Sequence, residues 1–410
     1  MLAPARSTRL LQHPLRSLCT SQIHGSQNPA SILPLSSSSS PHARFSSTSS
    51  QSPPSLISSP SPCSSTPLTI FSGIQPTGIP HLGNYLGALR TWASLQDAAA
   101  PSTKLFFSVV DLHAITLFQR PEELRRWRRE ALASLLACGV RAERSVVFWQ
   151  GKVPAHSELM WILSCTASMG YLSRMTQWKS KLSLSDNTSP LDESSRAKLK
   201  LGLFSYPVLQ AADILVHRAT HVPVGEDQSQ HLEFARECVT NFNHAYGVSH
   251  LVAPQTILSP TRRIMSLTSP TTKMSKSAPS PLSRILITDS PATITAKISS
   301  SLTDSDNSVS YSPALRPGVA NLLSILASFD GQGRSPAELG AKYEREAVGL
   351  GAFKKDVAGA VSQGLEGVRR EFERIVAEDG LVEDVAQKGA RAARESAEET
   401  MVLVREAVGL

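Results

Sequence analysis

Two short segments carry residues whose types and spacing suit chemistry on phosphates. The first, SGIQPTGIPHLGNYLGAL, runs from Ser72 to Leu89 and combines several glycines with His81 and Asn84. A glycine-rich turn before a helix lets backbone N–H groups and the positive end of the helix dipole approach a phosphate. His81 and Asn84 could add hydrogen-bond donors there. Alone this is a weak signal, because a glycine-rich loop can also hold an incidental histidine.

The second segment, KMSKS from Lys273 to Ser277, places two lysines three residues apart in a serine-rich stretch. Such a pair can act as a mobile cationic clamp that stabilises charge developing on a leaving pyrophosphate. The alternative is an ordinary solvated basic loop. However, average residue usage gives this pentapeptide by chance in roughly one chain of this length in 10⁴. The two segments together therefore indicate nucleotide chemistry.

Hydrophobic periodicity predicts the elements that must position these segments. Apolar runs of strand length at 68–74, 104–111 and 145–150 alternate with helical patterns at 81–95 and 121–139. The order strand, helix, strand, helix, strand predicts a parallel sheet with ligands beyond the carboxyl ends of its strands. We therefore expect an α/β protein: a doubly wound, Rossmann-like catalytic domain followed by a C-terminal α-helical domain.

The expected domain boundaries follow from shifts in composition. A leader covers 1–66, the catalytic domain 67–290 with a helical insertion at about 154–218, and the helical domain 291–410. No run of 18 apolar residues occurs, so we expect no membrane span. The five cysteines are scattered and form no CxxC pair, which argues against a disulfide framework and a structural zinc site.

The leader has the composition of an organelle transit peptide. It contains four arginines and many serines, and the first acidic residue of the chain is Asp97. We expect delivery to the mitochondrial matrix. The alternatives are a plastid, dual targeting, or a disordered tail that has no targeting function. Because the leader carries so much of the net charge of +7, the rest of the chain is too mildly basic to indicate nucleic acid by itself.

The two phosphate segments closely resemble the HIGH-type and KMSKS motifs of class I aminoacyl-tRNA synthetases, with Asn84 where the motif ends in His. The segment YPVLQAADILVHRATHVPVGEDQSQHLEFARE, at 206–237, resembles the tryptophanyl-tRNA synthetases in particular. So do SGIQPTG, VDLHAIT, MTQWKSK, RIMSL and RPGVANLL. The resemblance covers 71–410. It implies activation of L-tryptophan with ATP, transfer to tRNA(Trp), Mg²⁺ accompanying ATP, a homodimer, and no metal site in the protein.

The same resemblance implies roles for individual residues. The tryptophan site would consist of Phe71, Gln75, His113, Tyr206, Gln210, Asp213, Val222, Val224 and Gln228. The ATP site would consist of Gln75, Gly83, Asn84, Gly225, Asp227, Met265, Lys273, Met274, Ser275, Lys276 and Ser277. The catalytic residues would be His81, Asn84, Lys179, Lys273 and Lys276.

Asp213 is the residue that would select the amino acid. It lies in the apolar stretch LQAADIL, where a carboxylate is costly unless it has a partner. For a lone aspartate, a position on the helix surface is the default interpretation. The resemblance instead implies that Asp213 accepts the indole N–H of tryptophan, so that phenylalanine would leave the carboxylate buried and unpaired.

Three alternatives remain at this stage. A tyrosyl-tRNA synthetase shares both phosphate motifs, although AADIL and GEDQ argue against it. A synthetase-like protein that binds RNA, such as an intron-splicing helper, would lack amino acid activation. A nucleotidylyltransferase of the same superfamily would not need the C-terminal helices, which we expect to receive the anticodon.

Overall fold

The computed structural model describes residues 67–225, 228–258, 263–276 and 278–410 of the chain. The described residues belong to one compact unit. The expected transit peptide, residues 1–66, lies outside them, as do Asp227 and Ser277 of the expected ATP site.

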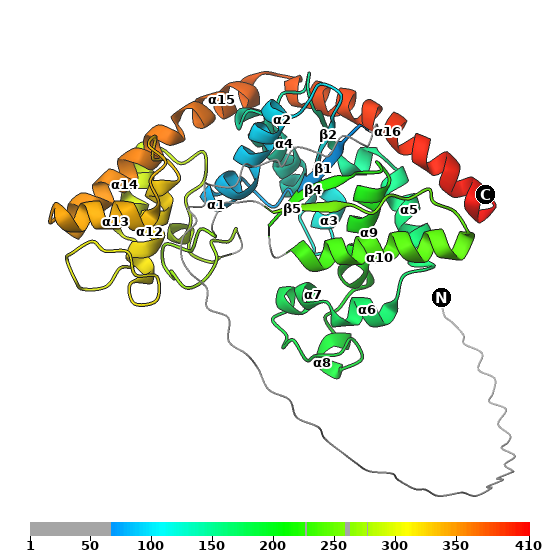
Figure 1. Ribbon diagram of the computed structural model, residues 1–410, viewed down its shortest axis with the longest axis horizontal. Helices are drawn as coiled ribbons and strands as arrows, with labels where there is room; N and C mark the ends of the chain where they lie inside the picture. Colours follow the sequence, from blue (N-terminus) through cyan, green and yellow to red (C-terminus); the bar gives the residue numbers. More distant parts are fainter. Residues whose placement is uncertain (1–66, 226–227, 259–262, 277) are drawn as a thin grey trace, which may run out of the picture. The chain divides into compact units, whose positions relative to one another are not determined.

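A five-stranded parallel sheet forms the centre of this unit (Figure 1). Its strands are β1 (Thr69–Ile74), β2 (Lys104–Val109), β3 (Val146–Trp149), β4 (His221–Val224) and β5 (Gln255–Leu258). They lie in the order β3-β2-β1-β4-β5, which is the order of a doubly wound nucleotide-binding sheet. The expected fold class is therefore confirmed. The chain leaves β1 toward β2 on one side and returns to β4 on the other, which places the topological switch point beside β1.

Alternating side chains of the strands enter two separate hydrophobic clusters. Ile70 and Phe107 belong to one cluster, whereas their neighbours Phe71 and Phe106 belong to the other. Successive residues of a strand point to opposite faces, so both faces of this sheet are buried. This explains why the sequence shows continuous apolar runs instead of strict alternation between apolar and polar residues.

Helices between the strands cover both faces. The first crossover contains α1 (Leu82–Asn84), η1 (Tyr85–Leu89) and α2 (Arg90–Ala98), and the second contains α3 (Asp111–Ala114) and α4 (Pro121–Ala137). The long crossover from β3 to β4 contains η2 (Gln150–Lys152), α5 (Ala155–Ser164), α6 (Met169–Arg174), α7 (Thr176–Lys181), α8 (Glu193–Arg196) and α9 (Leu201–Leu215). α10 (Ser229–Tyr246) connects β4 to β5. The predicted order of strands and helices at 68–150 is found as β1 to β3 with their crossovers, whereas β5 and the π-helical geometry of η1 were not predicted.

The C-terminal part is helical, as expected. It comprises α11 (Pro291–Ser299), α12 (Pro317–Ala327), α13 (Pro336–Arg345), α14 (Leu350–Gly364), α15 (Glu366–Ala377) and α16 (Leu381–Val408). α15 packs against α4, and α16 packs against the edge strand β3 and against α5 (Figure 1). At Gly389 a Cβ atom would lie only 1.9 Å from the carbonyl oxygen of Val147. Only glycine permits this close approach of a helix to strand backbone.

Candidate active site

A cavity of about 330 Å³ opens where β1 and β4 end. This is the switch point of the sheet, where ligands of doubly wound folds bind. All nine residues of the expected tryptophan site line it: Phe71, Gln75, His113, Tyr206, Gln210, Asp213, Val222, Val224 and Gln228. The cavity lies within the size range of small-molecule sites.

Residue spacing explains how these side chains converge. Tyr206, Gln210 and Asp213 are separated by four and three positions, so they lie on one face of α9. Val222 and Val224 are two apart in β4, so their side chains point to the same face of the sheet. A helix face and a strand face thus form opposite walls of the cavity.

Asp213 lies at the inner wall of the cavity and is only 1% exposed, which excludes a position on the helix surface. Its Oδ2 accepts a hydrogen bond from His113 Nε2 at 2.8 Å, and its Oδ1 accepts from His156 Nδ1 at 2.7 Å and Gln150 Nε2 at 2.6 Å. Burial alone would raise the pKa of Asp213, but the bonds from the two histidines lower it to about 2. The group is therefore a carboxylate at neutral pH, and it can only accept hydrogen bonds.

The other polar residues of the cavity form a second group. Tyr206 Oη contacts His231 Nε2 at 3.0 Å, and Gln210 Nε2 donates to Gln228 Oε1 at 3.3 Å. Lys181 also lines the cavity, with its Nζ 4.3 Å from the centre of the Tyr206 ring, and burial lowers its pKa. This lysine was not predicted, although the sequence MTQWKSK offered it as readily as Lys179.

Lys179 is not among the residues that line the cavity. It is buried, and its Nζ donates to the carbonyl oxygen of Asp186 at 2.5 Å. Its expected role near the phosphates stays a prediction.

The HLGN segment forms a compact helix start. His81 caps α1: its Nδ1 accepts from the backbone N–H of Asn84 at 3.2 Å, and Asn84 Oδ1 accepts from the backbone N–H of His81 at 3.2 Å. The side chain of Asn84 thus turns back onto the cap, with Gly83 between the two residues. Burial and the nearby charges of Lys276, Lys273 and Arg284 lower the pKa of His81 to about 3. Its ring is therefore neutral, with the proton on Nε2.

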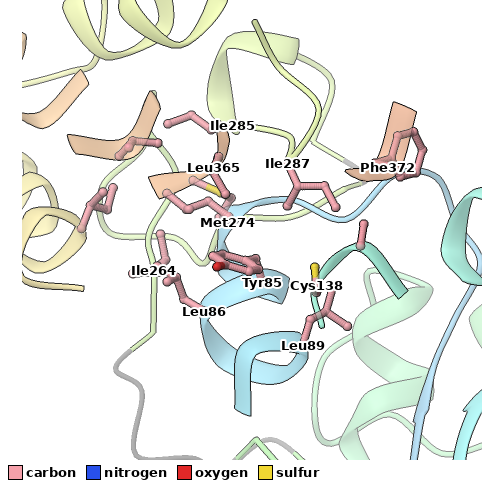
Figure 2. Packing of buried hydrophobic residues seen from close by; sticks show 14 of the residues in the cluster. Tyr85, Leu86, Leu89, Cys138, Ile264, Met274, Ile285, Ile287, Leu365 and Phe372 are labelled. Carbon is pink, nitrogen blue, oxygen red and sulfur yellow. The ribbon is translucent and has the colours of Figure 1, made fainter. Parts of the chain in front are cut away.

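The KMSKS segment begins within a short hairpin. Met265 pairs with Lys273 in an antiparallel bridge, and the N–H of Met274 donates to the carbonyl oxygen of Ile264 at 3.0 Å. Figure 2 shows the buried Met274 side chain in the same hydrophobic cluster as Ile264 and Tyr85. Met274 therefore anchors the motif, while Ser275 and Lys276 follow it and are only partly buried.

Asn321 of α12 clamps this hairpin. Its Oδ1 accepts from the N–H of Met265 at 2.9 Å, and its Nδ2 donates to the carbonyl oxygen of Met265 at 3.0 Å. The amide thereby satisfies both backbone groups of Met265, as a paired strand would. RPGVANLL is thus the segment that ties the C-terminal helices to the KMSKS region.

Lys276 connects the two phosphate segments. Its Nζ donates to the carbonyl oxygen of Gly78 at 2.9 Å, and Gly78 has a φ of 102°, a conformation that favours glycine. Burial lowers the pKa of Lys276 to about 8, although the charge of Glu130 partly opposes the shift. The ammonium therefore lies at the turn that precedes the helix start at His81.

The network behind Asp213 was missed by the sequence reasoning. Gln150 directly follows β3, and its position at the carboxyl end of a strand was an available signal. His156 lies in α5 and is completely buried. Nothing in its sequence context distinguishes it from an ordinary core histidine. Within the ranges that the structure describes, no cluster of three or more His, Cys, Asp or Glu residues could hold a metal ion.

Comparison with known proteins gives one consistent family. The model of the family "tRNA synthetases class I (W and Y)" matches residues 64–366. The mitochondrial tryptophan–tRNA ligase of Saccharomyces cerevisiae is 44% identical over 346 residues, which cover 83% of this chain and 90% of the yeast protein.

Two solved structures are similar to this chain over most of its length. Tryptophanyl-tRNA synthetase from Mycoplasma pneumoniae has a TM-score of 0.73 at 30% identity, and the match covers 84% of this chain and 98% of that one. The enzyme from Campylobacter jejuni, solved with ADP and tryptophan, has a TM-score of 0.68 at 30% identity and covers 84% and 100%.

Proposed function

We infer that this chain, which belongs to the tryptophanyl-tRNA synthetases of class I, activates L-tryptophan with ATP and transfers it to tRNA(Trp). The observation that carries this function is the cavity at the switch point, where an ionised and buried Asp213 lies beside apolar walls. The KMSKS lysines and the HLGN helix start accompany it. ATP is a substrate, as the class of enzyme requires.

We assign the cavity to tryptophan. The indole ring would lie against Phe71, Val222 and Val224, with its N–H directed to Asp213 and with His113 beside it. Tyr206, Gln210, Gln228 and Gln75 would meet the α-ammonium and the carboxylate. Lys181, which lines the same cavity, adds a positive charge suited to that carboxylate. Support for this orientation comes from the burial of Asp213 and from the hydrogen bond between Gln210 and Gln228, which places two polar side chains together in the same cavity.

We assign the phosphates of ATP to the two other segments. His81, Gly83 and Asn84, at the helix start, would lie against one side of the phosphates. Met265, Lys273, Ser275, Lys276, Ser277 and the backbone of Met274 would form the other side of the phosphate site. Lys179 would lie nearby, and Gly225 and Asp227 would lie toward the ribose. The substrate carboxylate attacks the α-phosphorus in line and pyrophosphate leaves. Since a carboxylate is already a nucleophile, this step needs positioning and charge stabilisation more than a general base.

Mg²⁺ would enter with ATP. Phosphate oxygens and water would provide most of its ligands, as is common for this ion. Bound there, it would neutralise phosphate charge. The residues of the chain orient the nucleotide through the helix start and the lysines.

In the second step the terminal ribose hydroxyl of the tRNA attacks the adenylate carbonyl and AMP leaves. We propose that the helices at 291–410 form a tRNA anticodon-binding domain that is distinct from the catalytic domain at 67–290. The hydrogen bonds between Asn321 and Met265 support a role in positioning the KMSKS segment as well.

We further propose a homodimer and no association with membranes. Phe118, at 89% exposed, and Trp161, at 72% exposed, support a protein contact, because large apolar side chains at a surface commonly mark interfaces. Among the described helices, none is both long and apolar enough to span a bilayer.

The relatives named mitochondrial support a mitochondrial address. The matrix, as opposed to a plastid or dual targeting, is our proposal from the leader at 1–66.

ATP–pyrophosphate exchange tests the function directly. Purified protein is offered each of the twenty amino acids in turn. Exchange with tryptophan alone is the expected result. Exchange with tyrosine would keep the class and overturn our assignment of the cavity. No exchange with any amino acid, from folded protein that binds ATP, would contradict the function itself.

A further inference from the structure

Three side chains from three separate elements converge on Asp213. His113 comes from α3, Gln150 from the turn after β3, and His156 from α5. Of these, only His113 also lines the cavity. Gln150 and His156 are completely buried and approach the carboxylate from behind the cavity wall. They therefore cannot touch a ligand in the cavity, and any effect they have on it must pass through Asp213.

Gln150 is itself fixed in place. Its Oε1 accepts from the backbone N–H of Leu112 at 3.1 Å, while its Nε2 donates to Asp213. The next residue, Gly151, donates its N–H to Asp111 Oδ1 at 2.7 Å, and Asp111 pairs with Arg128 at 2.7 Å. The amide therefore joins Asp213 to the start of α3, the short helix that carries His113.

His156 is held by packing. Its ring lies 5.8 Å from that of Phe148 and 5.2 Å from that of His217, measured between ring centres. Because an ionised carboxylate can only accept, Nδ1 of His156 must carry the proton that lies between the two groups. His156 of α5 is therefore the donor and Asp213 of α9 the acceptor, and the packing around the ring fixes the orientation of this bond.

The number of acceptor positions then limits what Asp213 can do. A carboxylate offers about four acceptor positions. His113, His156 and Gln150 occupy three of them, and the carboxylate borders the cavity. One position therefore remains for a ligand. A ligand without an N–H group leaves this fourth acceptor position of Asp213 empty, although the carboxylate keeps its bonds to His113, His156 and Gln150.

We propose that Gln150 and His156 are positioning residues for substrate selection, which hold Asp213 so that its one remaining acceptor position faces the indole N–H of tryptophan. This inference rests on the proposed function. It deepens that function, because selectivity then depends on the orientation of Asp213 as well as on its presence. An unsupported carboxylate could rotate to meet other donors and would discriminate less.

The test compares Gln150→Leu with a matched control, Gln96→Leu. Gln96 is equally buried, and its amide also bonds the backbone, through Gly139 and Arg141, but it does not line the cavity or contact Asp213. Pyrophosphate exchange is measured with tryptophan and with the analogue in which sulfur replaces the indole N–H. Both variants lose packing and hydrogen bonds. An effect that appears in both therefore reflects this general loss, whereas an effect that appears only in Gln150→Leu reflects the lost contact with Asp213.

For Gln150→Leu we expect the preference for tryptophan over the sulfur analogue, as a ratio of kcat/KM, to fall about tenfold or more, since a hydrogen bond to a charged group is lost. The KM for ATP stays unchanged. The control keeps the parent preference. Equal losses of kcat/KM for both substrates in Gln150→Leu would show a merely structural role and overturn the proposal.

A second variant, Gln150→Glu, keeps the shape of the side chain and can be tested if the leucine variant fails to fold. Its carboxyl group would face Asp213, so the pair should share a proton at acid pH and repel at alkaline pH. His113, His156, His217 and the Asp111–Arg128 pair, which bonds Gly151, also face this region. They are present in the parent and in Gln96→Glu, which serve as controls. We expect the Kd for tryptophan, measured by equilibrium dialysis, to rise with pH only in Gln150→Glu. A Kd with the pH dependence of the parent would overturn the proposal.

Failure of the inference and failure of the function are distinguishable. A parent protein that shows no exchange with tryptophan would overturn the proposed function and this inference with it. If the parent used tryptophan and the sulfur analogue equally well, the proposed function would stand, but recognition of the indole N–H by Asp213 would be overturned. A parent that discriminates, with Gln150→Leu unchanged in its preference, would overturn the positioning role alone.

Discussion

The two ends of the active site are built in different ways. The amino-acid end, the cavity around Asp213, is fixed by buried side chains from three elements, which all bond Asp213 of a fourth element, α9. The nucleotide end, comprising residues 81–84 and 265–276, is fixed by bonds to the backbone. Side chains make them at the His81 cap and at the Asn321 clamp, and backbone groups make them in the hairpin that ends at Met274. Its lysines extend from this frame and are partly exposed.

This difference indicates how each end should respond to substitution. Backbone pairing tolerates many side chains, so at the nucleotide end we expect large effects only from the lysines and their few anchors. A buried polar network depends on every member, because each loss leaves another group unsatisfied. Changes at the amino-acid end should therefore alter which substrate is used, whereas changes at the nucleotide end should alter how fast it is used.

Lys276→Ala should produce the largest effect. Removal of a cation that stabilises a leaving phosphate lowers kcat by about 10²- to 10³-fold in comparable sites. We expect such a loss in tryptophan-dependent pyrophosphate exchange, with the Kd for tryptophan almost unchanged. Lys354→Ala is the matched control, since this lysine also donates to a backbone carbonyl, that of Ser301, outside the cavity. Unchanged turnover in Lys276→Ala would contradict the clamp.

Asp213→Asn should have the next largest effect, on the other end. The new amide would present N–H groups to donors from His113, His156 or Gln150. We expect kcat/KM for tryptophan to fall about 100-fold, as when a buried pair is lost in a selective site, with little change in the Kd for ATP. Equilibrium binding of each substrate separates the two effects. A variant that uses tryptophan as well as the parent does would remove the role of Asp213 in recognition.

The sequence predicts the nucleotide end and the fold better than it predicts the network behind the cavity. Strand-length apolar runs separated by helical patterns determine the order of elements and hence the sheet. Likewise, Tyr206, Gln210 and Asp213 reach one wall because their spacing matches a helix. Both patterns depend only on residues that are close together in the sequence, so a single sequence is enough to show them.

The partners of Asp213 could not be predicted in this way. Gln150 and His156 are separated from Asp213 by 63 and 57 residues. The packing of α5 against α9 brings His156 to Asp213, and the end of β3 brings Gln150 there. The sequence also does not determine which of Lys179 and Lys181 faces the cavity, because both lie in the same short helix and differ only in the face on which each lies. The strand β5 was missed because only two of its four residues, Ile257 and Leu258, are apolar, whereas all four residues of β3 are apolar.

Asn321→Ala should have a smaller effect that sharpens the comparison. The loss of both bonds to Met265 would loosen the base of the hairpin, so we expect kcat to fall about tenfold, in line with one to two lost hydrogen bonds. The KM for tryptophan should stay constant. A drop in the affinity for tryptophan of similar size would show that the two ends are not independent.

Asn243→Ala provides the matched control for this variant. Its amide makes the same pair of bonds, accepting from the N–H of Leu251 and donating to the carbonyl oxygen of Leu251, away from the cavity. Thermal unfolding should show comparable destabilisation of both variants. Only Asn321→Ala should turn over more slowly, because only its clamp holds the KMSKS segment.

The smallest effect expected is a dependence on pH that separates the two ends without any substitution. The pKa of Lys276 is lowered to about 8, so the ligand-free enzyme loses this positive charge as the pH rises through 8. The KM for ATP should increase about fourfold between pH 7 and pH 8.5, which is the change in the charged fraction of such a group. The pKa values of Asp213, about 2, and of His81, about 3, lie far below this range. Lys181 lines the cavity and its pKa is also lowered by burial, so the comparison is made in a Lys181→Arg background, which keeps that charge. There the KM for tryptophan should stay flat.

Stability should not follow the activity. The pKa of Lys276 is lower in the folded protein than the usual 10.5, so between pH 8 and 10.5 the unfolded chain binds more protons at this site and its contribution favours folding as the pH rises. Denaturation midpoints that hold while the KM for ATP increases would thus assign the effect to the charge and not to loss of structure. Lys276→Arg, which keeps its charge, should abolish the rise in KM above pH 8. If the KM values for ATP and tryptophan rose in parallel in the Lys181→Arg background, the two ends would share one titrating group, and the division between them would have to be abandoned.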